Sequence, residues 1–240
     1  MDQVDVVAGS QNGTAGLASF LRSAVAGMFT RETLIPGLLL MVLLTASNIV
    51  ILLNMPTTKG ALPPAPFLVA AAVRIAGILL VAVALLRLAT ASERPRWLPD
   101  GGFGLYALSF ATGLLASALA RLLTGGRTDL TGLLISNVVV TLLLAPLVPW
   151  FVALAVAKPL AWRPRFWMRR LGDWLPPLLV WTLLLVMPMA ILHATIDMWL
   201  IQGAGGWFWP AALFDGVLST LMALIGLALN AAAYRRVARG

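Results

Sequence analysis

Four ionisable side chains lie within stretches of the chain that are otherwise almost entirely apolar: Arg74, His193, Asp197 and Asp215. An Arg or Asp at the centre of a membrane-spanning helix costs about 2.5–3.5 kcal/mol on insertion scales, so each of these groups needs a partner or a function. His193 and Asp197 are four residues apart and therefore share one face of a helix. The second acid, Asp215, follows after a short loop and can approach that face.

These residue types are compatible with three kinds of chemistry. One His and two Asp could ligate a metal, but no known metal-binding spacing accompanies them. A polar substrate or a proton could bind between them, since the pKa of histidine suits proton relay. The third interpretation is charge neutralisation, in which two arginines balance the two acids inside a helix bundle. We favour this third interpretation, and the sequence predicts no metal and no cofactor.

No catalytic motif supports an enzyme. The chain has a single His, which excludes an H-E-x-x-H zinc site, and it has no G-x-S-x-G elbow. It has no Cys, which excludes thiolate metal sites, disulfides and cysteine nucleophiles. Enzymatic function therefore has no positive evidence in the sequence.

The polar residues must be positioned by membrane-spanning helices. Hydrophobic residues make up 60% of the 240 positions and charged residues only 11%, whereas soluble domains carry about 25% charged residues. A spanning helix needs about 20 mostly apolar residues. Six stretches satisfy this requirement: Leu34–Asn54, Pro66–Leu86, Gly104–Ala120, Leu130–Ala157, Leu175–Leu200 and Ala211–Ala233. The predicted fold is an all-α polytopic bundle of six transmembrane helices occupying residues 34–240, with a short basic tail.

The cations are distributed unequally between the two sets of loops. Thirteen lie before the first span, between spans two and three, between four and five, and after six; three lie in the opposite set or at its border, namely Lys59, Arg121 and Arg127. Loops rich in Lys and Arg stay in the cytoplasm. The sequence thus predicts a multi-pass protein of the inner membrane with both termini in the cytoplasm.

This topology gives a depth for each polar residue. At 1.5 Å per residue, Arg74 lies about 12 Å below the outer end of its span, and Asp215 about 6 Å below. His193 and Asp197 lie about 10 and 5 Å below the outer end of span five. Arg121 lies at the outer end of span three. We therefore predict one polar cluster of these five residues in the outer half of the bundle, in which Arg74 pairs with Asp197 or Asp215.

Two asparagines, Asn48 and Asn137, fall at the same depth in spans one and four. Both are expected near the outer polar cluster.

The residues before the first span divide into two segments. Residues 1–13 are rich in Gly, Ser, Gln and Asn and are predicted to be disordered. In residues 14–31 apolar side chains recur at helical spacing with Arg22 off the stripe. This pattern is typical of an amphipathic helix on the cytoplasmic leaflet, and the alternative is a plain extension of the first span, against which Pro36 and Gly37 argue.

A second surface element is expected between spans four and five, where basic residues alternate with aromatic ones. The cations are Lys158, Arg163, Arg165, Arg169 and Arg170, and they alternate with Trp162, Phe166, Trp167, Leu171 and Trp174. The tryptophans are expected at the level of the lipid headgroups. Basic residues interleaved with aromatic rings can bind RNA. Here the cluster joins two spans on the cytoplasmic side, so anionic lipid headgroups explain it and no nucleic-acid partner is predicted.

Three function classes remain, of which one, an intramembrane enzyme acting on lipid, is supported only by the cluster of Arg, Asp and His. The favoured one is a non-catalytic membrane scaffold or a component that binds lipid or a partner. The alternative is a small transporter or channel component with its polar site in the outer half of the bundle. A water-accessible cavity at Arg74 would favour the transporter, and a dry, fully paired cluster would favour the scaffold.

Overall fold

The computed structural model describes the backbone of residues 5–56, 62–94, 96–127, 129–156 and 163–239, and within these ranges the side chains of residues 16–238. The protein is 88% helical, and the described residues form no strand. Six helical segments are long and apolar enough to cross a membrane, which confirms the predicted all-α bundle of six spans. Lys59, Lys158 and Trp162 lie outside the described residues.

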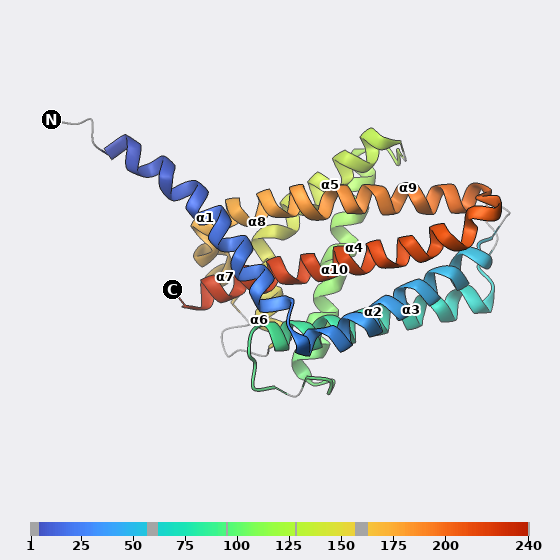
Figure 1. Cartoon of the computed structure of the whole chain (residues 1–240), viewed down its shortest axis with the longest axis horizontal. Coiled ribbons are helices and arrows are strands. Elements are labelled where there is room, and N and C mark those ends of the chain that lie inside the picture. Colours follow the sequence, from blue (N-terminus) through green and yellow to red (C-terminus); the bar gives the residue numbers. More distant parts are fainter. Residues whose placement is uncertain (1–4, 57–61, 95, 128, 157–162, 240) are drawn as a thin grey trace.

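The helices follow one another along the chain with short connections (Figure 1). Their bounds are α1 Asp5–Met28, α2 Arg31–Leu53, α3 Ala65–Ala89, α4 Gly101–Leu123, α5 Leu130–Leu144, α6 Val148–Ala155, α7 Pro164–Leu171, α8 Leu175–Trp181, α9 Met187–Gly203 and α10 Phe208–Arg239. The fourth span is α5 and α6 joined by a 3₁₀ turn, Ala145–Leu147. The fifth is α8 and α9 joined by a π-helical segment, Thr182–Val186, directly before Pro188. Because proline has no N–H to donate, it disrupts the regular hydrogen-bond ladder at this point.

Four helices form a layer in which α2, α3, α9 and α10 run side by side, with α10 packed against both α2 and α9 (Figure 1). The α4–α5 hairpin crosses this layer at a steep angle (Figure 1). We call the end of the layer where α2 begins and α3 and α10 end the α1 end. The opposite end, where α9 ends and α10 begins, is the far end.

Most of the outer surface is apolar. Large side chains such as Ile35, Leu108, Leu115 and Leu122 are more than half exposed. Such exposure would be unstable in water but matches contact with lipid chains, which are as apolar as leucine. The protein therefore contacts the lipid bilayer.

Helix α1 is separate from the first span, because the chain breaks at Phe29–Thr30 and not at Pro36, which lies inside α2. It begins at Asp5 rather than at residue 14, so it includes most of the segment predicted to be disordered. The predicted apolar stripe is used for packing on protein: Phe20, Ala24 and Met28 are buried against α10 and α8. Arg22 is exposed, as the pattern predicted.

Arginines of α10 fix α1 in place. The Arg235 guanidinium donates to the carbonyl oxygens of Ser23 and Ala89. The Arg236 guanidinium lies 4.6 Å above the Trp174 ring, which itself stacks on Phe20. Arg235 and Arg236, which are among the cations used to predict the topology, thus also link the C-terminal end of α10 to α1.

The basic segment between spans four and five forms the short helix α7. Arg163, Arg165, Arg169 and Arg170 are all exposed. Trp167 is buried and stacks on Tyr234 at 5.3 Å between ring centroids. This tryptophan is a core residue, whereas the sequence pattern placed it at the lipid headgroups.

A buried arginine, Arg87, links three helices at the α1 end. The side chain of Arg87 is fully buried; it donates to the carbonyl oxygens of Ala155 and Leu98 and forms an ion pair with Asp100. Asp100 in turn caps α4 by accepting from the Phe103 N–H. One arginine therefore joins α3, α4 and α6.

The Asp100 carboxylate predicts a pH dependence of stability. Burial acts to raise the pKa of Asp100, but hydrogen bonds from the Phe103 N–H and the Arg87 guanidinium outweigh it and hold the pKa below its usual range. A depressed folded-state pKa stabilises the fold at pH values above the unfolded pKa, and this contribution is lost as pH falls through the folded value. The melting temperature of the wild type in detergent should therefore fall as pH is lowered below the usual pKa of aspartate. The melting temperature of Asp100→Asn, which has no carboxyl group at this position to protonate, should fall less over the same pH range. An equal acid-induced fall in both proteins would contradict the assignment.

Candidate functional site

At the far end of the layer, Arg74, His193, Asp197 and Asp215 form one polar cluster, which we call the far-end cluster. Its centre is Asp215 on α10, whose side chain is fully buried. Nδ1 of His193 lies 2.6 Å from Asp215 Oδ1, and Nε2 lies 3.6 Å from Asp197 Oδ2. His193 and Asp197 are on one face of α9, as their spacing predicted. The loop between α9 and α10 brings this face against Asp215.

Asn48 on α2 connects these acids to Arg74. Its amide nitrogen donates to Asp215 Oδ2 at 2.9 Å and to Asp197 Oδ1 at 3.2 Å. Its amide oxygen accepts from the Arg74 guanidinium at 2.8 Å. An amide side chain presents both a donor and an acceptor, so it can satisfy an arginine and a carboxylate at once. The predicted direct pair between Arg74 and an acid is thus replaced by a bridge through Asn48.

Close helix packing makes this bridge possible. The Cα of Gly216, next to Asp215, faces Thr45 of α2, and a Cβ at this glycine would lie 3.0 Å from the Thr45 Cα. A glycine therefore lets α10 approach α2 closely enough for Asp215 to reach Asn48. Arg74 is carried by α3, which packs along α2.

The hydrogen-bond geometry indicates the charge state of the cluster. Nδ1 of His193 is hydrogen-bonded to Asp215, and Nε2 lies at ion-pair distance from Asp197 without a hydrogen bond. An imidazolium, which has an N–H on each nitrogen, is favoured by both carboxylates. In that state Arg74 and His193 balance Asp197 and Asp215. Loss of the His193 proton would leave one uncompensated negative charge at low dielectric, which is unfavourable.

A metal site and a nucleophilic triad both fit this geometry poorly. His193, Asp197 and Asp215 offer ligand atoms within 4.8 Å of one another. However, both carboxylate oxygens of Asp215 already have hydrogen-bond partners, His193 at Oδ1 and Asn48 at Oδ2, so an ion would have to displace one of them. A nucleophilic triad needs the serine and the acid on opposite nitrogens of the histidine. Here Ser219 Oγ, at 3.2 Å, and Asp215 both lie beside Nδ1.

Arg121 is not brought to this cluster. It lines a separate cavity of about 410 Å³ between α4 and α5, together with Arg127, Ser136 and Asn137. Within the described ranges no acid forms an ion pair with Arg121. The predicted depth was compatible with the cluster, but the α4–α5 hairpin crosses the layer and takes this residue elsewhere.

Sequence reasoning missed two roles in the cluster. Asn48 was recognised at the right depth but not as the bridge. Ser219, which lies four residues after Asp215 and so on the same helical face, was not singled out. The i, i+4 spacing on α10 was the signal that could have identified it.

Comparison with protein-family models, with curated proteins and with solved structures found no match. The function must therefore follow from the geometry of this chain. That geometry shows a multi-pass membrane protein whose far end contains a mutually hydrogen-bonded set of ionisable side chains.

Proposed function

We propose that this protein is a non-catalytic component of the inner membrane that binds lipid or a membrane partner, with both termini in the cytoplasm. The observation that carries the proposal is that the charged groups at the far end are paired with one another through Asn48. Such a network accounts for the buried charges as structural links between α2, α3, α9 and α10. In this topology the exposed arginines of α7 face anionic lipid headgroups.

Two apolar grooves support the binding role. One, of about 400 Å³, lies between α2 and α10, and another, of about 770 Å³, lies between α2 and α3. Both open on the lipid-facing side of α2. Neither contains a charged residue of the far-end cluster.

A small transporter is the second candidate, because two members of the cluster are partly accessible. The side chains of His193 and Asp197 are 20% and 30% exposed. Their span also contains the π-helical segment Thr182–Val186, a deformation often found at functional sites. Water reaching the cluster would favour this candidate.

A cysteine probe distinguishes the two candidates, since the chain contains no Cys. Ser219→Cys is nearly isosteric and places a thiol beside His193 Nδ1. A membrane-impermeant thiol reagent should label this variant at least tenfold more slowly than Gly206→Cys in the exposed turn before α10. Equally rapid labelling of both variants would mean a water-filled path to the cluster, and the transporter would replace the scaffold.

The same chemistry tests the proposed topology. In intact cells Gly206→Cys should react with the impermeant reagent, because the far end is expected to face outward. Glu93→Cys, in the exposed loop between α3 and α4, should react only after the membrane is permeabilised. The reverse pattern would invert the topology.

A further inference from the structure

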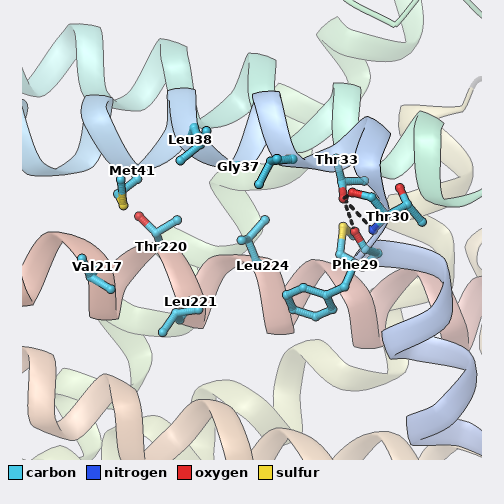
Figure 2. Close-up of a pocket in the computed structure, with 12 residues that line it drawn as sticks. Phe29, Thr30, Thr33, Gly37, Leu38, Met41, Val217, Thr220, Leu221 and Leu224 are labelled. Atoms are coloured by element: carbon cyan, nitrogen blue, oxygen red, sulfur yellow. Dashed lines mark hydrogen bonds between the residues drawn. The ribbon is translucent and has the colours of Figure 1, made fainter.

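The groove between α2 and α10 has the form of a channel for one hydrocarbon chain. It is closed at the α1 end by the α1–α2 turn and is lined by residues that include Phe29, Thr33, Gly37, Met41, Val217 and Leu224. Figure 2 shows Gly37 opposite Leu224 in the middle of this groove, with Met41 and Val217 toward the far end. Because Gly37 has no side chain, Leu224 packs close to the backbone of α2 at this point of the groove.

Two of the three threonines that line the groove, Thr33 and Thr220, turn their hydroxyls to backbone carbonyls, and the third, Thr30, lies at its α1 end. Thr33 Oγ1 is hydrogen-bonded to the main-chain carbonyls of Met28 and Thr30 (Figure 2). Thr220 Oγ1 donates to the carbonyl of Gly216 at 2.8 Å. The hydroxyls of Thr33 and Thr220 are therefore both hydrogen-bonded to backbone carbonyls. A hydrocarbon chain in the groove would contact mostly apolar atoms.

The length of the groove matches one leaflet of a bilayer. Along α2 it runs from Thr30 to Met41, about 16 Å at 1.5 Å per residue. Half of a hydrocarbon core of about 30 Å is about 15 Å. A partner helix is about 10 Å wide with its side chains, so it would cover a groove of about 400 Å³ rather than enter it.

A positive charge stands at the α1 end of the groove. Arg31 is exposed and lies one turn before Leu34, on the same stripe of α2 that lines the groove. Among the described residues no acid forms an ion pair with Arg31, since the adjacent Glu32 is paired with Arg96 at 3.0 Å. A phosphate at this position would meet a free guanidinium.

We infer that this groove binds one anionic phospholipid from the leaflet at the α1 end, with an acyl chain between α2 and α10 and its phosphate against Arg31. The inference rests on the proposed lipid-binding function and specifies its site. Apolar contact along the groove holds the chain, and Arg31 selects the charged headgroup.

The test uses the full chain purified in detergent with phosphatidylglycerol or phosphatidylcholine, with bound lipid counted by native mass spectrometry. Wild type should retain one phosphatidylglycerol in preference to phosphatidylcholine. Gly37→Leu fills the groove and should reduce retention at least tenfold. A Cβ at this position would lie 3.6 Å from Leu224 Cδ1, an ordinary contact, and the remaining atoms of the leucine side chain would extend into the groove. The melting temperature of Gly37→Leu checks that it folds, and Gly104→Leu, at an exposed glycine of α4 with no heavy atom near its Cβ position, is the matched control.

Arg31→Gln separates the headgroup from the chain. It should lower the preference for phosphatidylglycerol about fivefold, the effect of one surface cation on an anionic lipid, while a chain is still retained. Retained lipid that is insensitive to both Gly37→Leu and Arg31→Gln would overturn the site but leave the lipid-binding function standing. A wild-type protein that retains neither lipid would overturn the lipid-binding function together with the site.

Discussion

Replacing Asn48 with leucine is expected to destabilise the bundle by about 3 kcal/mol, because buried charged groups lose their hydrogen-bond partner. The amide of Asn48 satisfies Arg74 on one side and Asp197 and Asp215 on the other. Leucine has a similar volume, so the variant removes hydrogen bonds without opening a cavity. Thermal or denaturant unfolding in detergent measures the effect.

Asn137→Leu is the matched control for Asn48→Leu. The Asn137 amide donates to the Leu133 carbonyl of its own helix at 2.9 Å, so its loss leaves no charge unpaired. Its effect on the free energy of unfolding should be much smaller. Equal destabilisation by the two substitutions would show that Asn48 has no bridging role.

Alanine substitutions at two glycines of α10 are expected to change stability in opposite directions. Gly216→Ala places a methyl group against Thr45, and overpacking of this kind costs about 1–3 kcal/mol. Any shift of α10 would also move Asp215 away from Asn48. At Gly226 no heavy atom outside the local helix lies within 4 Å of the Cβ position, so Gly226→Ala should stabilise the helix by about 0.5–1 kcal/mol.

A smaller side chain at position 45 should restore part of the stability that Gly216→Ala removes. Thr45→Ala combined with Gly216→Ala is expected to be more stable than Gly216→Ala alone, because the side chain met by the new methyl is smaller. If Gly216→Ala is as stable as Gly226→Ala, close approach at Gly216 does not position the cluster.

The spans were predictable because long apolar stretches with few charges leave little choice in a membrane. The structure confirms all six and extends several ends by a turn, since polar residues such as Arg31 and Arg87 can continue a helix beyond its apolar part. The grouping of His193, Asp197 and Asp215 followed from spacing on α9 and the short loop to α10.

The positions of Arg121 and Trp167 were not predictable in the same way. The sequence predicts a residue's depth in the membrane, but it does not predict the direction in which each helix runs or which helices it contacts. Arg121 has the depth of the cluster but lies on a hairpin that crosses the layer. Trp167 has the composition of a headgroup anchor but packs on Tyr234, because α7 lies against the end of α10. In both cases a residue type allowed two environments, and only the packing of distant helices decided between them.

The central claim is that Arg74 and the acids form one energetically coupled network. The most direct test is a double-mutant cycle with Arg74→Met and Asp197→Asn, measured as free energy of unfolding in detergent. Each single variant should be destabilised because it leaves the cluster with an unbalanced charge. The double variant, in which one charge of each sign is removed, should be at least 1 kcal/mol more stable than the sum of the single effects predicts, within the range of about 0.5–3 kcal/mol for coupled sites. The exposed pair Arg127 and Asp129 provides a reference cycle with weaker coupling. Additive effects for Arg74 and Asp197 would contradict the account.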